Sequence, residues 1–528
     1  MPSSSRLVRA YLCTGGAVLA AILLGPPALM GEEMSVDEIS VDQAEKAAGG
    51  FSFRRFRPSV LPVAAAVLVL VVHFRPWQQG LLEDWGLALA WKQEGFGGYV
   101  ARLPATLGRP LHLLPHFVGM ALSNGGFVGP YAVLTAVALG QLLCAAWALA
   151  PVVSSRALRW GIALAIAVHP WWAGGDILRF MPAQVAVLGV VVWLGAAVRF
   201  LEGRRAAWLV LATLAPLAGL LTYEGPLAAL LIGAFTLTAT GRASVRRRLA
   251  VFGSTVLVAA AVVAWSAVIA PAISPQSYEG QLVGGLPDPR ASVVAIARTM
   301  LHHTPALLLA LAIVGLIVLD LGFSRRVGRR DAWVLLVATV SAPLAALAYA
   351  ATSLHLHDPE RVGLPVGVAA WLVLCVAAPA IAAAAAPRRV VLAVLLLGSV
   401  AGAVAGYRTW TTFAEDQQQL IRALEPVRAA APPGSTVVVA DESGRWGDVY
   451  LFLPPHLALA MQVEQGAGAA VELCTQDGIA RHQPVADVYP IATTPACSAI
   501  VAPDATRSAT VSVGAGTVDV FLQPATVK

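Results

Sequence analysis

The chain has 528 residues, of which 58% are hydrophobic and only 12% are charged. Soluble proteins carry about 25% charged residues, so the composition excludes an ordinary soluble domain. The formal net charge of +6 does not indicate nucleic-acid binding, because the arginines lie between long uncharged apolar runs. We therefore expect a polytopic membrane protein that binds the lipid bilayer and no nucleic acid. An alanine-rich composition with more arginine than lysine suggests a bacterium with a GC-rich genome.

Residues 1–57 precede the first long apolar run. The stretch "AYLCTGGAVLAAILLG" (10–25) resembles the apolar part of a signal peptide, but no small-x-small cleavage site follows it. A span here would place the cluster "RRFR" (54–57) outside the cell, against the charge rule. We therefore expect translation to begin at Met30 or Met34, and residues 1–57 to be a disordered cytoplasmic segment.

Eleven apolar runs have about the ~20 residues that a helix needs to cross ~30 Å of hydrocarbon. They lie at 58–74, 128–150, 160–175, 181–199, 206–223, 225–240, 249–270, 305–322, 332–352, 362–385 and 390–407. Arginine clusters occupy every second connection, and positive connections stay in the cytoplasm. The sequence predicts an all-α polytopic domain over residues 58–410 in the cytoplasmic membrane. Its N-terminus would lie inside, and its C-terminal region outside.

Residues 411–528 follow a different pattern. Amphipathic stretches at 413–431 and 456–466 predict helices, and short apolar stretches predict strands. The expected strands cover 436–441, 470–475, 498–503, 509–513 and 517–522. We expect a small extracytoplasmic α/β domain without catalytic function. Its two cysteines, Cys474 and Cys497, would form a disulfide if their Cα atoms lie within about 7 Å.

Ionisable residues in the expected outer connections are the main functional signal, because charge near a membrane is costly. The adjacent carboxylates Glu83 and Asp84 open the long first outer loop, residues 75–127. The other candidate substrate-binding residues are Arg109, His112, Asp176, Arg179, Tyr223, Glu224, His355, His357 and Arg361. Each alone could simply solvate a loop. Together they predict a covered pocket at the outer boundary between lipid and water.

A sugar carried on a polyprenyl phosphate suits such a pocket, because bacteria keep no nucleotide pool outside the membrane. Its phosphate leaves already ionised, and the forked guanidinium of arginine is well suited to hold it. The acceptor hydroxyl needs a carboxylate base on the opposite face of the anomeric carbon. One carboxylate and one arginine are thus the minimum for a single displacement that inverts the anomer.

The order of a cytoplasmic N-terminus, a first span, an outer loop opening with an acidic pair, many further spans and an outer C-terminal domain resembles the GT-C superfamily. These glycosyltransferases use polyprenyl-phosphate sugars. The resemblance implies that Asp84, with Glu83 as a near-equal candidate, is the base. The segment "PERVGLP" (359–365) is similar to an arginine–x–x–leucine–proline segment of some members. It implies that Arg361 contacts the lipid phosphate, although Val362 replaces the usual tyrosine.

The expected function is therefore transfer of a sugar from a polyprenyl-phosphate donor to an envelope glycan or lipid acceptor. No cofactor is required by this chemistry, and a divalent metal remains an open option. A transporter or flippase of lipid-linked precursors is the alternative, but transporters place polar groups on broken, repeated helices near the midplane. Here no repeat is visible and mid-span polar residues such as Gln141 and Gln184 are sparse. A non-catalytic envelope assembly protein is a third option. Convergence of Asp84, Glu224 and Arg361 would favour the enzyme.

Overall fold

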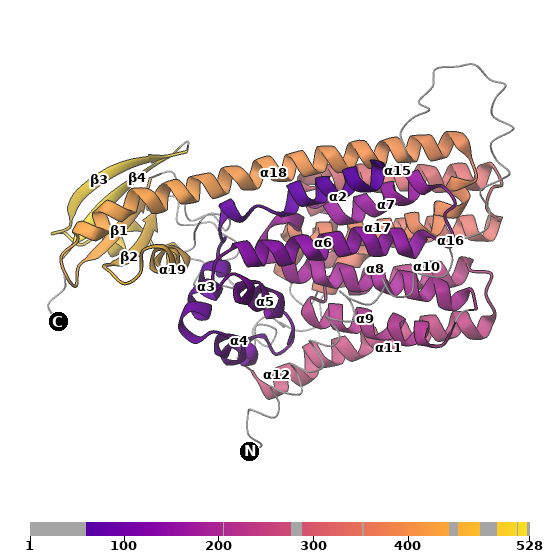
Figure 1. The fold of residues 1–528 in the computed structure, drawn as a ribbon, viewed down its shortest axis with the longest axis horizontal. Helices are drawn as coiled ribbons and strands as arrows, with labels where there is room; N and C mark the ends of the chain where they lie inside the picture. The colour runs from indigo at the N-terminus through magenta and orange to yellow at the C-terminus, as the bar shows by residue number, and fades with distance from the viewer. Residues whose placement is uncertain are drawn as a thin grey trace.

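The computed structural model describes residues 60–203, 205–275, 288–350, 353–442, 452, 454–475, 494–514 and 516–524. The expected N-terminal segment 1–57, with its start at Met30 or Met34, lies outside these residues. The described chain forms a long helical bundle and a small sheet, joined by one helix, α18 (Ala385–Ala430), that runs along the bundle and on to the sheet (Figure 1).

The bundle is built from helices that run back and forth between its two ends. They are α2 (Val60–His73), α6 (Val128–Leu149), α7 (Arg156–Val168), α8 (Met181–Leu201), α9 (Ala207–Thr222), α10 (Leu227–Thr240), α11 (Val245–Ala264), α15 (Pro305–Phe323), α16 (Arg329–Ser341), α17 (Pro359–Ala382) and α18. The π-helical turn η6 (Trp265–Ile269) and α12 (Ala270–Ile273) extend α11, and η7 (Ala342–Tyr349) extends α16.

Each of the eleven expected apolar runs overlaps one of these helices. Eight helices of the described chain are long and apolar enough to cross a membrane. Helices α7, α9 and α10 are shorter, with 13, 16 and 14 residues. The structure therefore supports a membrane protein with eight candidate spans, and the count of eleven remains a prediction.

Helix α7 ends earlier than the expected run 160–175, at Val168. His169 adopts a left-handed conformation with φ 46°, and Pro170 follows, so the helix cannot continue. Two short 3-10 turns follow instead, η4 (Ala173–Asp176) and η5 (Leu178–Phe180). Asp176 and Arg179 are thus carried on turns at the end of the bundle.

Helices α8 and α17 form the centre of the bundle. Their most apolar stretches are 94% and 83% buried, against 22% for α11, α15 and α18. Helix α9 approaches α8 closely at Gly189, where an added Cβ would lie 2.7 Å from the carbonyl oxygen of Ala215. The exposed apolar faces of the peripheral helices are typical of surfaces that contact lipid.

The connection between α2 and α6 is largely helical. It contains η2 (Pro76–Gln78), α3 (Glu83–Glu94), α4 (Gly97–Arg102), η3 (Leu103–Thr106) and α5 (Leu114–Leu122). Two further elements support the same end of the bundle, α14 (Pro289–His303) and the turn η8 (Ser353–His357). Thr299 of α14, which the sequence analysis did not single out, donates a hydrogen bond from its hydroxyl to the carbonyl of Leu356, at 2.7 Å.

The C-terminal sheet has the strand order β2-β1-β4-β3. Its elements are β1 (Thr436–Asp441), α19 (Pro454–Gln465), β2 (Ala470–Thr475), α20 (Cys497–Ile500), β3 (Thr506–Val513) and β4 (Gly516–Gln523). Strand β1 pairs with β2 in parallel and with β4 antiparallel. The expected strand at 498–503 is wrong, because a short apolar run does not distinguish strand from helix and α20 forms there. A disulfide joins Cys474 to Cys497, with Cα atoms 4.9 Å apart.

The expected boundary between residues 410 and 411 falls inside α18, which has 46 residues. The chain has no glycine or proline between Tyr407 and Glu425, so nothing interrupts the helix. A rigid helix, rather than a linker, therefore carries the sheet.

The α/β domain packs on the first connection. Trp85 and Ala88 of α3 share one apolar core with Leu457 and Met461 of α19. Gln417 of α18 also donates to the carbonyl of Gly80, at 2.7 Å. We call this end of the bundle, with α3, α5 and the sheet, the domain end (Figure 1).

Among the described residues, the expected cytoplasmic arginine clusters fall at the opposite end of the bundle; the cluster at 54–57 lies outside the described residues. They lie in the connections from α6 to α7, α8 to α9, α10 to α11, α15 to α16 and α17 to α18. This one-sided distribution of charge agrees with the expected sidedness. The orientation of the bundle in a membrane remains a prediction.

Candidate functional site

Every candidate site residue lies at the domain end, on segments that hydrogen bonds and ion pairs join. Arg109 and Glu224 form the tightest of these links. Arg109 Nε and Nη2 donate to the two carboxylate oxygens of Glu224, at 2.6 and 2.5 Å. The Arg109 guanidinium also lies 5.2 Å from the centre of the Tyr223 ring. His112 donates from Nδ1 to the Thr222 carbonyl, at 3.1 Å. Both substrate-binding candidates on this loop, Arg109 and His112, thus hold the first connection against the turn between α9 and α10.

Arg361 is fixed at the start of α17. Asp358 caps this helix by accepting a hydrogen bond from the backbone N–H of Glu360, at 2.9 Å. Arg361 Nη1 donates to the hydroxyl oxygen of Tyr223, at 3.1 Å, and Tyr349 donates to the same oxygen, at 2.9 Å. Arg361 Nε lies 3.6 Å from an Asp358 carboxylate oxygen. Glu224, Tyr223 and Arg361 therefore belong to one connected cluster.

The adjacent carboxylates Glu83 and Asp84 have opposite environments. Asp84 is only 1% exposed, and one of its oxygens accepts a hydrogen bond from the Leu81 N–H, at 3.0 Å. Burial raises the pKa of Asp84 to about 7, against the effect of that hydrogen bond. The Glu83 side chain is 54% exposed and lies 3.6 Å from Arg179 Nε. Neighbouring residues on a helix point about 100° apart, which explains why only one of the two is accessible.

Charge near Glu83 favours its ionised form. Burial acts to raise the pKa of Glu83, but Arg179, His456, a backbone hydrogen bond and Arg361 together lower it, so the pKa lies below its ordinary value. Because Arg361 also acts on Glu83, the acidic pair and the Arg361 cluster lie near one another.

His116 is a buried neighbour of Asp84 rather than its ionic partner. Its Nε2 lies 3.0 Å from the Leu178 carbonyl, which can only accept, so Nε2 carries the proton. Burial lowers the pKa of His116 to about 4. The imidazole is therefore neutral at neutral pH, and its 3.6 Å approach to Asp84 is not an ion pair there.

The positive charges of three arginines act on the imidazole of His355. Burial, and then the charges of Arg361, Arg109 and Arg179, lower the pKa of His355 to about 2. Arg109 has a bidentate carboxylate partner. Arg361 Nε and Arg179 Nε each lie 3.6 Å from a carboxylate oxygen, of Asp358 and Glu83 respectively. That distance exceeds a hydrogen bond, so these two contacts exchange more readily for another anion. His357, on the same turn as His355, is exposed.

Asp176 is set apart from the cluster by a buried ion pair. Arg75 donates from Nη2 to an Asp176 carboxylate oxygen, and both side chains are almost fully buried. A Cβ on Gly406 of α18 would lie 3.3 Å from that oxygen, so the pair is closed off by α18. The sequence analysis proposed Asp176 as a substrate-binding residue, but this geometry fits a structural lock between α2 and η4.

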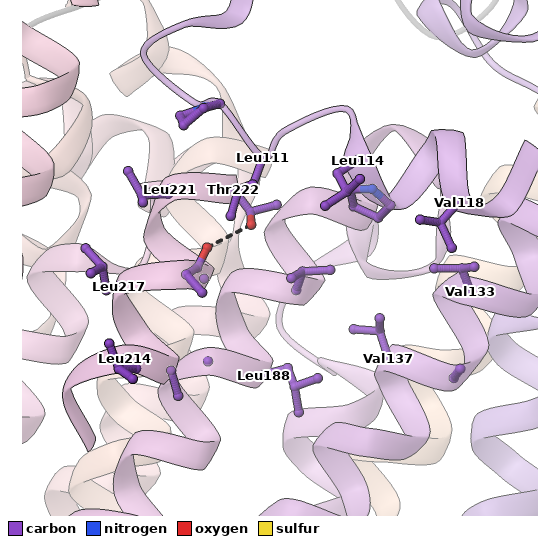
Figure 2. A pocket seen from close by; sticks show the side chains of 18 of the residues that line it. Leu111, Leu114, Val118, Val133, Val137, Leu188, Leu214, Leu217, Leu221 and Thr222 are labelled. Carbon is purple, nitrogen blue, oxygen red and sulfur yellow. Dashed lines mark hydrogen bonds between the residues drawn. The ribbon is translucent and has the colours of Figure 1, made fainter. Parts of the chain in front are cut away.

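An apolar cavity of about 700 Å³, partly open at the bundle surface, lies between helices beside the cluster. Figure 2 shows side chains from α5, α6, α8 and α9 around it, including Leu114, Val137, Leu188 and Leu217. Thr222 also lines it and directly precedes Tyr223 of the cluster. The lining comes from separate helices, so no local pattern in the sequence could have predicted it.

The π-helical turn η6 connects this cavity to the loop that carries Arg109. Trp265 lines the cavity, and its indole N–H donates to the Leu107 carbonyl, at 2.8 Å. The Ser266 hydroxyl donates to the next carbonyl, that of Gly108, also at 2.8 Å. The loop that carries Arg109 is therefore fastened to the cavity wall.

Sequence reasoning missed two residues of this end, Arg75 and His456. Arg75 directly follows the first apolar run, and this position was a usable signal. His456 belongs to α19 of the α/β domain, to which no functional residue was assigned. It gave no local signal, because only the packing of that domain on α3 brings it to the site.

Among the described residues, no group of three or more histidine, cysteine, aspartate or glutamate side chains is placed to hold a metal ion. Use of a divalent metal stays a hypothesis from the sequence. No family model, curated protein or solved structure matches this chain. A function is consequently argued from the site itself.

Proposed function

We propose that this protein is an inverting membrane glycosyltransferase. It transfers a sugar from a polyprenyl-phosphate donor to an envelope glycan or lipid acceptor on the outer face of the cytoplasmic membrane. The observation that carries the proposal is a juxtaposition at the domain end. An exposed carboxylate, Glu83, and two arginines whose charges act on it, Arg179 and Arg361, lie at this end, and a large apolar cavity adjoins the cluster to which Arg361 belongs.

Arg361 and Arg179 are the phosphate-binding residues in this proposal. A phosphate accepts charge-assisted hydrogen bonds that are shorter and stronger than the 3.6 Å contacts these arginines make with carboxylates. Arg109 keeps its bidentate contact with Glu224 and shapes the site instead.

Glu83 is the base. The resemblance favours Asp84, but the burial of Asp84 leaves its carboxylate unable to meet an acceptor. In the reaction, the acceptor hydroxyl gives its proton to Glu83 and its oxygen bonds to the anomeric carbon. The bond from that carbon to the phosphate oxygen breaks, and its electron pair stays on the phosphate, next to the arginines. Asp84 holds the turn that begins α3, through its hydrogen bond with Leu81.

The apolar cavity is the site for the lipid chain of the donor. Ligand cavities are typically 300–1,000 Å³ and largely apolar, with a few polar groups that fix orientation. The cavity of about 700 Å³ meets this description, and the Tyr223 and Arg361 cluster adjoins it. A polyprenyl chain in the cavity would place its phosphate at the arginines.

Transport of lipid-linked material is the second candidate, because a buried polar chain crosses between α6, α7 and α8. Gln141 donates to Gln184 Oε1, at 2.7 Å, and His169 Nε2 lies 2.9 Å from the same oxygen. This chain lies inside the bundle, as a translocation path would. The exposed charges at one end favour surface chemistry more strongly.

The test is transfer by purified protein in lipid nanodiscs. Radiolabelled polyprenyl-phosphate sugars are supplied as a panel, with envelope extract as the acceptor. We expect a labelled product whose new linkage has the inverted anomeric configuration. Movement of donor lipid across vesicles without any labelled product would support the transporter instead. Absence of transfer from every donor in the panel would reject the proposal.

A further inference from the structure

Helix α19 of the α/β domain lies alongside α3 and runs in the same direction. A Cβ on Gly86 of α3 would lie 3.4 Å from a methyl group of Leu459. Further along both helices, Lys92 Nζ donates to the Val463 carbonyl, at 2.7 Å. Since the contacts follow the same order in both helices, the two helices are parallel and their first turns lie side by side.

These first turns carry Glu83 and His456, each three residues before the contact of Gly86 with Leu459. The charge of Glu83 raises the pKa of His456 and that of Arg179 lowers it, but burial has the largest effect and leaves the pKa below its ordinary value. His456 in turn acts on Glu83. The imidazole therefore lies beside the carboxylate and the arginine of the site.

His456 is equipped to bind a ligand. It is 7% exposed, and its Nδ1 has no hydrogen-bond partner among the residues that the structure describes. A neutral imidazole has one N–H donor and one acceptor nitrogen. This combination matches a sugar hydroxyl, which both donates and accepts. A phosphate, which only accepts here, is better served by arginine.

The position of α3 indicates which substrate, the donor or the acceptor, His456 would contact. In Figure 1, α3 lies between α19 on one side and the bundle helices on the other. The apolar cavity lies between helices of the bundle, so a donor lipid would approach Glu83 from that side. His456 approaches from the domain side, where the donor chain is not.

We propose that His456 is an acceptor-binding residue, so that the α/β domain contributes a hydrogen bond that orients the acceptor hydroxyl toward Glu83. This inference rests on the proposed glycosyl transfer. It gives the domain a role in acceptor specificity and none in the chemical step.

The experiment compares His456→Ala and His456→Gln with wild type in the transfer assay, with the acceptor and donor varied separately. Loss of one hydrogen bond between neutral groups should raise the acceptor KM about three- to tenfold. The donor KM, and the slow hydrolysis of donor by water, should stay at wild-type values. His456→Gln should restore part of the acceptor affinity, because an amide also donates and accepts.

Glu464→Gln is the matched control, because Glu464 is an exposed residue of the same helix. It should leave both KM values unchanged. Chemical cross-linking of Gly86→Cys with Leu459→Cys, in the His456→Ala background, reports whether the domain stays docked. An unchanged acceptor KM in a docked His456→Ala variant would overturn this inference but not the proposed glycosyl transfer. A fall in kcat with unchanged acceptor KM would overturn it in favour of a positioning role. Failure of wild type to transfer would overturn the proposed function and this inference with it.

Discussion

Two arginine–carboxylate pairs at the domain end behave very differently. Arg75 and Asp176 are 0% and 5% exposed, and α18 closes over them. Arg179 and Glu83 are 21% and 54% exposed, and their atoms approach only to 3.6 Å. A buried pair cannot lose one partner without leaving an uncompensated charge, whereas an exposed pair contributes little to stability. The same residue types therefore form a buried structural pair in one place and an accessible pair, which we propose is reactive, in the other.

The largest expected effect is a loss of activity, without a loss of stability, at the exposed pair of Arg179 and Glu83. Glu83→Gln should lower kcat for transfer about 10²- to 10⁴-fold, because it removes the general base. Its melting temperature should match wild type. Asp84→Asn should retain most activity, since Asp84 is enclosed. The measurement is transfer from a matched donor lipid.

Glu94→Gln, at the other end of α3, is the control for that experiment, because Glu94 is exposed and far along the helix. Wild-type activity in Glu83→Gln, together with lost activity in Asp84→Asn, would return the base to Asp84. The roles proposed for the two carboxylates would then be exchanged.

The next effect should appear in stability at the buried pair. Asp176→Asn leaves Arg75 buried and charged, which typically costs about 3–5 kcal/mol. We expect a large fall in the thermal unfolding temperature of the detergent-solubilised protein. Replacing both residues by leucine should recover most of it, because no charge is left unpaired. A double variant as unstable as the single one would mean that the pair is not a mutual lock.

Arg361 and Arg109 should also differ, one affecting donor binding and the other stability, with smaller effects. Arg361→Ala should raise the donor KM about 10- to 100-fold, through loss of a charge-assisted hydrogen bond to phosphate. Arg109→Ala should mainly lower the unfolding temperature, because Glu224 loses its bidentate partner. Titration of a donor lipid against each variant, alongside thermal unfolding, checks both. Equal effects on binding and stability in the two variants would contradict the division.

The smallest expected effect is the pH dependence of protein stability that arises from Asp84. Its pKa is raised from 3.8 to about 7, so the folded state favours the protonated form. The stability associated with that proton is fully present below pH ~4 and is lost as pH rises through about 7. Asp84→Asn resembles the protonated form at every pH. It should therefore gain stability relative to wild type at pH 8 and show little difference at pH ~3.5. Thermal unfolding at the two pH values measures this, and a pH-independent difference would contradict it.

Much of the fold was predictable from local pattern. The length of each apolar run predicted a helix, and α2, α6 and α15 lie within two residues of the expected bounds. The strands β1, β2 and β4 also matched their alternating or buried apolar stretches. Errors arose where a local pattern was ambiguous or continued unexpectedly. The short run at 498–503 became α20, and α18 continued through the expected domain boundary.

The sequence by itself determined that this is a helical, membrane-type protein with a small α/β domain, and that its candidate site residues fall in connections on one side. Helix length, charge between runs and strand alternation are local properties, so they can be read along the chain. Only the tertiary structure decided that Asp84 is buried while Glu83 is exposed, that Asp176 pairs with Arg75, and that helix α19, which carries His456, packs on α3. Burial and pairing depend on segments far apart in the sequence, which come together only when the helices pack.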